Sequence, residues 1–295
     1  MPGLARGIDH LVLAVRDLDA VGDFYTQLGF TVGARNRHPW GTENRIVQLD
    51  GSFLELVTVA DEAQIPPYGP RQFSFGAFVR DYLAAREGFA MLVLESRDGA
   101  ADARHFAAAD IGDFEPFFFE RRGRRPDGSE TTVAFTLAFA RDAGAPEVGF
   151  FTCQHHHPEN FWNAAFQQHA NGARRIDTVV MAADNPTDHH IFLTAFTGQR
   201  DLHATSLGVS AQLPRGRFDI LSADACGRLY GLANAPRHPA LVAFTIAVDD
   251  VDAVAARLAS AGIPSRAIGP RLVVPPEAAF GVALAFEPAE RSTRA

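Results

Sequence analysis

The sequence predicts an α+β fold that consists of four modules with the element order β-α-β-β-β. An apolar run at residues 8–15 is followed by a helical pattern that begins near Asp17 and ends at Gly29. Apolar residues spaced by three or four are typical of an amphipathic helix, and glycine commonly follows its last turn. Residues 247–254 match residues 14–21 almost position for position. Such self-similarity indicates a repeated structural unit.

The first module covers residues 8–58. Asp17 or Asp19 is expected to cap its helix, because short polar side chains accept hydrogen bonds from the first helical N–H groups. Three strands follow the helix, near residues 30–32, 45–49 and 52–59.

Three further modules are expected at residues 89–157, 175–223 and 240–288. The second has a helix near residues 99–110. The later strands of these modules are expected near residues 114–121, 131–141, 148–154, 204–212, 217–223, 265–268, 271–274 and 281–287. Proline, glycine and polar residues separate the modules, and the join near residue 172 is the expected domain boundary. This gives an N-terminal domain over residues 1–170 and a C-terminal domain over residues 171–295.

Composition excludes several classes of function. A net charge of −8 argues against nucleic acid and anionic membranes as partners. No apolar run approaches the roughly 20 residues that span a bilayer, and no signal-peptide pattern is seen at the N-terminus. Two separated cysteines, Cys153 and Cys226, form no disulfide framework, so a cytoplasmic location is expected. The sequence contains no lysine, which excludes Schiff-base chemistry and a P-loop.

Two polar residues interrupt apolar strands. His10 lies in the first expected strand and Glu55 in the strand at residues 52–59. An imidazole and a carboxylate are ligand types that divalent metals recruit. Taken singly, His10 could be a core histidine bonded to the backbone, and Glu55 could be paired with an arginine such as Arg45. Burying an unpaired carboxylate costs several kcal/mol, so Glu55 needs a cation, a donor or a proton in either case.

These residues lie within a recognisable pattern. Residues 8–15 read Ile-Asp-His-Leu-Val-Leu-Ala-Val, and Asp-Leu-Asp, Phe-Tyr, Leu-Gly-Phe and Leu-Glu-Leu follow. The pattern resembles the vicinal oxygen chelate (VOC) superfamily, which includes glyoxalase I, bleomycin-resistance proteins and extradiol dioxygenases. Residues 41–45 and the run at 154–158 resemble the glyoxalase-like domain group of that superfamily. The resemblance implies that paired modules form two VOC-type cupped, mixed β-sheet domains.

The resemblance also implies a metal inside a cup, with ligands on the first and last strands of each module. Alignment of the modules places Met91, Thr178 and Ala243 opposite His10. Opposite Glu55, the fourth module offers Glu287 and the third offers Asp219 or nothing. The C-terminal domain is therefore expected to lack a complete metal triad. The histidines of that domain are expected in surface or capping roles: His189, His190, His203 and His238.

A third ligand is expected from the end of the second module. Strand alternation places Gln154 on one face together with Thr152, and His155 lies at the strand end, where a bulge could turn it inward. Imidazole is the stronger ligand for zinc or iron. The alternative interpretation of residues 155–157 is a solvated loop.

Aromatic and polar residues are expected around the substrate. Trp40, Asn44 and Arg45 suit a rim that supplies an aromatic wall, an amide donor and an anion clamp. The alternative is an ordinary hairpin turn set by Gly41. Trp162, with the preceding Phe161, could cover the site.

The function expected from these residues is that of a metal-dependent VOC-type enzyme acting on a small substrate with vicinal oxygens. It would be a glyoxalase-like lyase or isomerase, with His10 and Glu55 as catalytic residues. The metal would stabilise an enediolate or activate water, and Glu55 could act as a general base. Zinc, iron, manganese and nickel remain open, as does a homodimer. The alternatives are an extradiol-type iron dioxygenase and a metal-free, bleomycin-resistance-like binding protein for an aromatic ligand.

Overall fold

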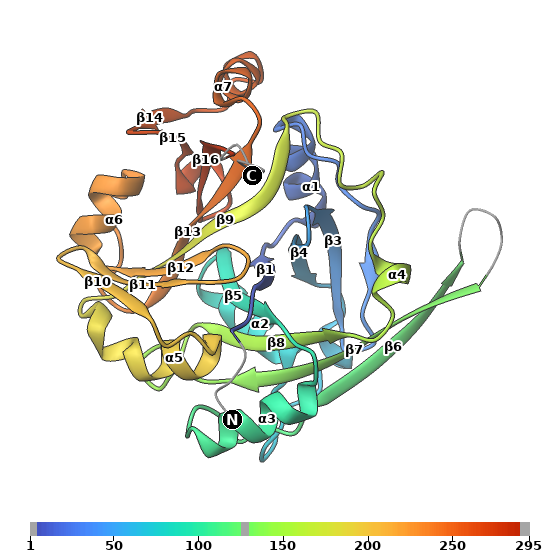
Figure 1. The fold of residues 1–295 in the computed structure, drawn as a ribbon. Helices are drawn as coiled ribbons and strands as arrows, with labels where there is room; N and C mark the ends of the chain where they lie inside the picture. Colours follow the sequence, from blue (N-terminus) through green and yellow to red (C-terminus); the bar gives the residue numbers. More distant parts are fainter. Residues whose placement is uncertain (1–4, 125–129, 290–295) are drawn as a thin grey trace, which may run out of the picture.

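The computed structural model describes residues 5–124 and 130–289. Its strands form two eight-stranded mixed sheets with helices packed beside them, so the predicted α+β class with two cupped sheets is confirmed (Figure 1).

The two sheets have the same topology. The strand order is β2-β3-β4-β1-β5-β8-β7-β6 in the first sheet and β10-β11-β12-β9-β13-β16-β15-β14 in the second. The first sheet contains β1 (Ile8–Ala14), β2 (Asn36–Arg37), β3 (Thr42–Gln48), β4 (Phe53–Val59), β5 (Gly88–Glu95), β6 (Phe117–Arg124), β7 (Glu130–Ala140) and β8 (Gly149–His155). The second contains β9 (Ala173–Ala182), β10 (Leu202–Thr205), β11 (Gly208–Gln212), β12 (Arg217–Leu221), β13 (Ala240–Val248), β14 (Arg266–Ile268), β15 (Arg271–Val274) and β16 (Ala283–Pro288).

The helices connect these strands. They are α1 (Leu18–Gln27), α2 (Phe75–Ala85), α3 (Gly99–Ala108), α4 (Pro158–Phe161), α5 (His190–Thr197), α6 (Ala223–Tyr230) and α7 (Val251–Ser260). Asp17 caps α1 by accepting hydrogen bonds from the N–H groups of Asp19 and Ala20, which decides between the two predicted caps. Asp250 caps α7 in the same way.

The sheets share one hydrophobic core on the faces that lie away from their cups. Phe150 of β8 contacts Phe192 and Phe196 of α5 and Phe218 of β12, which joins the first sheet to the second half of the chain. Each cup has a separate apolar cluster. The cluster of the first cup includes Val12 and residues of α2, and that of the second includes residues of α6.

A bulge in β1 changes the direction of one side chain. His10 pairs with Val93 of β5 and Ile8 with Leu94, so Asp9 has no partner of its own in the ladder. Ile8 and Leu11 consequently lie in the same core although they are three residues apart. A bulge redirects the extra residue, and here that residue is Asp9.

Corresponding bulges align the modules. They lie at Ala90 of β5, Asp177 of β9 and Val242 of β13, each one residue before the position that corresponds to His10. The structure therefore confirms the expected counterparts of His10, which are Met91, Thr178 and Ala243.

Some local predictions were wrong. No strand forms at residues 30–32; the short strand is β2 at Asn36–Arg37. Helices α2 and α6 lie outside the elements that the sequence predicts. His189 is buried, with its Nδ1 2.5 Å from Asp142 Oδ2.

Within residues 5–124 and 130–289, no helix has the length and hydropathy needed to cross a membrane.

Substitution Phe150→Ala tests the shared core. It removes a fully buried ring from contacts with both halves of the chain, and should lower the free energy of unfolding by about 3–5 kcal/mol in urea titrations. Phe118→Ala is the control, because Phe118 is 54% exposed and should change the value by less than about 1 kcal/mol. Equal losses in the two variants would contradict a core shared by the sheets.

Candidate functional site

A small pocket lies inside the first cup. Its volume is about 50 Å³, well below the roughly 300 Å³ or more of a pocket for a drug-sized ligand. The walls are mostly aromatic, and polar side chains meet within them. The lining residues are His10, His38, Trp40, Asn44, Ile46, Phe53, Glu55, Phe75, Phe119, Arg121, Phe135, Leu137, Phe151, Cys153 and Phe161.

His10 is held in place on two sides. Its ring stacks on Phe53 with centroids 4.2 Å apart, and its Nδ1 lies 2.6 Å from Asp9 Oδ1. Burial raises the pKa of the Asp9 carboxyl. The charge of His155 and hydrogen bonds from His10 and His155 lower this pKa by more, so the net result is a pKa below the usual range of an aspartate. An ionised carboxylate only accepts hydrogen bonds. Nδ1 of His10 therefore carries the proton, and Nε2 can present a lone pair to the pocket when the ring is neutral.

Glu55 faces that nitrogen from β4. Its Oε2 lies 3.8 Å from His10 Nε2, and its Oε1 accepts a hydrogen bond of 2.6 Å from Asn44 Nδ2. Only 6% of the Glu55 surface is exposed. The donor that satisfies Glu55 is thus an amide of β3, and not Arg45 as one interpretation of the sequence suggested.

His38 is a pocket residue that the sequence analysis missed. Its Nδ1 lies 2.8 Å from Thr42 Oγ1, its Nε2 lies 3.7 Å from Glu55 Oε1, and its ring stacks on Trp40. Burial lowers the pKa of His38, although Glu55 partly opposes this effect, so the imidazole is neutral near pH 7. The residue lies in a loop with no strand periodicity, and only its closeness to Trp40 and Asn44 in the sequence could have indicated it.

His155 lies behind Asp9. Its Nε2 is 3.1 Å from Asp9 Oδ2, its ring stacks on Trp162, and its buried Nδ1 has no hydrogen-bond partner among the described residues. No bulge is needed to turn it inward, because Cys153 and His155 lie on the same face of β8 by regular alternation. The structure places His155 against the Asp9 carboxylate, away from the His10–Glu55 pair.

Two predicted site residues point away from the pocket. Gln154 accepts a hydrogen bond from the Gly99 N–H at the start of α3, because its face of β8 is the helix-covered face. Arg45 forms an ion pair of 2.8 Å with Asp19 of α1, since β3 alternates between Asn44 and Ile46 inside and Arg45 outside. Trp40 and Asn44, which the sequence predicts at a substrate rim, line the pocket, and Trp162 lies against His155 and Phe53.

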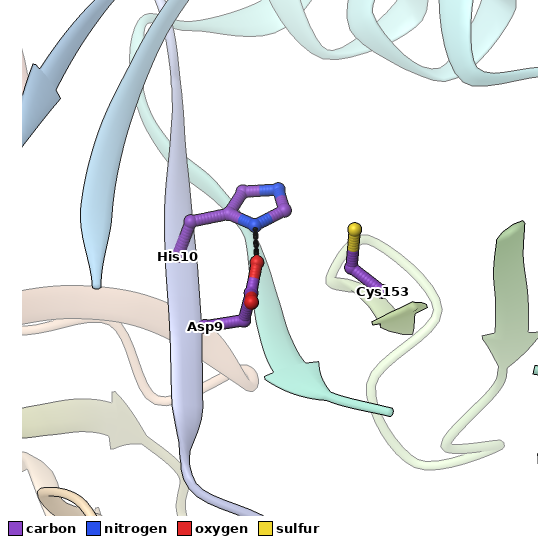
Figure 2. Close-up of side chains that lie close together, drawn as sticks. All are labelled: Asp9, His10 and Cys153. Carbon is purple, nitrogen blue, oxygen red and sulfur yellow. Dashed lines mark hydrogen bonds and ion pairs between the residues drawn. The ribbon is translucent and has the colours of Figure 1, made fainter. Parts of the chain in front are cut away.

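Asp9, His10 and Cys153 form a second set of possible metal ligands. Figure 2 shows Asp9 and His10 side by side on β1, with the sulfur of Cys153 facing the same space. One possible ligand atom from each of these three residues lies within 4.8 Å of the other two. No other set of three or more histidine, cysteine, aspartate or glutamate residues in the described part of the chain meets this distance. Burial and the charges of Asp9 and Glu55 raise the pKa of the Cys153 thiol well above its ordinary value. A metal bound there would have to displace a proton from sulfur.

The donor set fits a divalent metal at the His10–Glu55 pair. Two ligands with bonds of about 2.1 Å in a tetrahedral arrangement lie about 3.4 Å apart, and the 3.8 Å between His10 Nε2 and Glu55 Oε2 is close to that value. A carboxylate that holds the second nitrogen of a ligating histidine is a common arrangement at metal sites. The second module contributes no ligand there, because Met91 and Phe151 occupy the positions that correspond to His10 and Glu55.

The cup of the second sheet has a different chemistry. Thr178 occupies the position of His10, and Asp219 occupies that of Glu55, paired with Arg217 at 2.9 Å. Glu287 lies two residues beyond the expected position, which is taken by Ala285, and forms an ion pair with Arg271. No imidazole faces this set of paired charges at the position of His10.

The fold and the pocket define a protein of the vicinal oxygen chelate superfamily. Within it, the chain belongs to the glyoxalase-like domain family, whose profile matches residues 8–197. The match includes the whole first sheet and extends through β9 and α5 of the second half. No curated protein sequence matches the chain significantly.

Solved structures share this fold. A hypothetical protein from Staphylococcus aureus is similar over 96% of this chain and 100% of its own, with a TM-score of 0.68 and 14% identity. The Mn(II)-bound glyoxalase from Novosphingobium aromaticivorans is similar over 96% and 82%, with a TM-score of 0.51 and 15% identity. A variant 4-hydroxymandelate synthase from Streptomyces coelicolor is similar over 90% and 77%, with a TM-score of 0.53 and 12% identity. Identities this low show a common fold only.

The lowered pKa of His38 predicts an acid-sensitive contribution to stability. Below the unfolded pKa of about 6.5, the unfolded chain binds a proton at His38 that the folded chain excludes, so stability falls as the pH decreases. The melting temperature should therefore fall less between pH 7 and pH 5 in His38→Asn than in the wild type. His156→Asn is the control, because His156 is exposed. An equal pH slope in wild type and His38→Asn would contradict the prediction.

Proposed function

We propose that this chain is a metal-dependent enzyme of the VOC type that acts on a small substrate with vicinal oxygens, as a glyoxalase-like lyase or isomerase. The observation that supports this most directly is the position of His10 Nε2, which faces the Glu55 carboxylate across 3.8 Å inside an aromatic pocket. Two lone-pair donors that face each other in an apolar pocket require a cation or a proton between them.

His10 and Glu55 would hold the metal. The similarity to the fold of a Mn(II)-bound glyoxalase supports a divalent ion, and zinc, iron, manganese and nickel all remain candidates. His155, proposed from the sequence as third ligand, is better placed to hold Asp9. The competing arrangement uses Asp9, His10 and Cys153.

The chain's own residues have separable tasks in this proposal. The metal would supply Lewis acidity to two adjacent substrate oxygens. Asp9 keeps the proton on Nδ1 of His10 and so directs Nε2 into the pocket. Asn44 holds Oε1 of Glu55, so Oε2 is the oxygen that would bind the metal and, when released from it, would accept a substrate proton as general base. The aromatic walls and Phe161 exclude water from this transfer.

The division of the chain at residue 170 is part of the same proposal. Residues 1–170 would form the domain that carries the site, and residues 171–295 a domain without a metal centre. Support comes from the contrast between the two cups, since Thr178 replaces the imidazole in the second.

A metal-free binding protein for an aromatic ligand is the second candidate, because the pocket walls are largely aromatic. An extradiol-type dioxygenase would need two histidines and one carboxylate on a single iron. His38 supplies a second imidazole beside Glu55, but His10, His38 and Glu55 do not form a group close enough to share an ion in the described residues.

Metal content measured without an affinity tag tests the proposal. We expect close to one divalent ion per chain in the wild type by mass spectrometry of the metals. Little bound metal should remain in the His10→Ala and Glu55→Gln variants, because each variant loses one metal ligand. His156→Ala should retain the metal, since His156 is exposed. Wild-type protein without metal that binds aromatic compounds as tightly as its His10→Ala variant would favour the second candidate.

Two further variants separate the two metal arrangements. Cys153→Ala should keep the metal if His10 and Glu55 bind it, and should lose it if Asp9, His10 and Cys153 do. Asp9→Asn should lower metal affinity by about 10- to 100-fold, as removal of a carboxylate behind a ligating histidine does. Competition with a fluorescent chelator measures both effects, and unchanged affinity in Asp9→Asn would contradict the assigned role of this carboxylate.

A further inference from the structure

Arg121 is a charged residue of the pocket that the proposed chemistry leaves unused. It lies on β6, where alternate residues face the cup, and it lines the pocket with Phe119 from the same strand. His10 and Glu55 line the same pocket from β1 and β4. Neither composition nor strand pattern distinguishes Arg121 from its neighbour Arg122 in the sequence, and only the pairing of β6 with β7 places it inside.

The guanidinium of Arg121 has no direct partner among the described residues. No ion pair or hydrogen bond joins it to a side chain or to the backbone in residues 5–124 and 130–289. Burial lowers the pKa of Arg121, and the charge of Glu55 partly opposes this. An arginine remains charged even so. The pocket therefore contains a positive charge that is partly removed from water and not in contact with an anion.

Arg121 is not simply the counter-ion of Glu55. The atoms close to the Glu55 carboxylate are Asn44 Nδ2 at 2.6 Å, His38 Nε2 at 3.7 Å and His10 Nε2 at 3.8 Å. An arginine that serves as a structural counter-ion contacts its carboxylate directly, as Arg217 contacts Asp219 in the second cup.

We propose that Arg121 binds a carboxylate group of the ligand, so that the substrate class is a small carboxylic acid that also carries two adjacent oxygens. A guanidinium presents several N–H donors in a planar fork that matches a carboxylate, and an anion that enters this pocket offsets the cost of the buried positive charge. The assignment of the adjacent oxygens rests on the proposed function. The assignment of the carboxylate rests on Arg121 alone.

The test compares ligands that differ only in the carboxylate. Glycerate has two adjacent hydroxyl groups and a carboxylate, and glycerol has the hydroxyl groups alone. Binding of both is measured by isothermal titration calorimetry, with the protein metal-free and with Mn²⁺ added. The variants are Arg121→Gln, which removes the charge, and Arg121→Lys, which keeps the charge without the fork. Arg122→Gln is the matched control, because Arg122 is the exposed next residue of the same strand.

Glycerate should bind more tightly than glycerol in the wild type and in Arg122→Gln. Arg121→Gln should reduce the affinity for glycerate by about 10- to 100-fold, the range of a lost charged hydrogen bond, and leave glycerol binding and Mn²⁺ binding unchanged. The affinity of Arg121→Lys for glycerate should lie between those of the wild type and Arg121→Gln. It also covers the case in which Arg121→Gln fails to fold, which circular dichroism would reveal.

The outcomes separate this inference from the proposed function. Equal binding of glycerate and glycerol to a protein that binds Mn²⁺ would overturn the role of Arg121 and leave the metal enzyme standing. A preference for glycerate that depends on Arg121 in a protein that binds no Mn²⁺ would support the carboxylate site and contradict the metal proposal. Loss of glycerate binding in Arg122→Gln as large as in Arg121→Gln would show a general charge effect and overturn the inference.

Discussion

The buried carboxylate of Asp9 is the constraint on which the site depends. A carboxylate removed from water must be paired, because the cost of leaving it alone amounts to several kcal/mol. Two histidines meet this requirement, His10 from the same strand and His155 from β8 on the other side of β5. In doing so they receive fixed orientations. The ring of His10 directs Nε2 toward Glu55, and the ring of His155 lies against Trp162.

The two cups show how one topology supports different chemistry. In the second cup, charged side chains form ion pairs with one another: Arg217 pairs with Asp219, and Arg271 pairs with Glu287. In each of these pairs the two opposite charges lie against each other. In the first, Glu55 is held by a neutral amide and faces an imidazole across a gap. Local strand register is nearly the same in both, so the difference arises from side chains and not from the backbone.

The sequence predicted the fold class, the order of modules and the counterparts of His10, because these follow from periodic apolar patterns and internal similarity. It also indicated Trp40 and Asn44, since both lie in the loop and strand beside Glu55. The contact of Asp9 with His10 and His155 could not be predicted, because regular alternation puts Asp9 on the opposite face from His10 and only a bulge in β1 moves it. Gln154 is expected on a polar face of β8 together with Thr152, whereas that face is covered by α3 and the cup side of the strand is apolar until His155. His38 lies in a loop without strand periodicity, and Arg121 faces the pocket only through the pairing of β6 with β7, so no periodic pattern indicates either residue.

The shared core on the outer faces of the two sheets has a consequence for how this protein can change over generations. Phe150, Phe192, Phe196 and Phe218 join the halves on the side away from both cups. A mutation inside one cup therefore leaves the joint between the halves untouched. The side chains in one cup can therefore be replaced while the pocket of the other half and the contacts between the halves are kept.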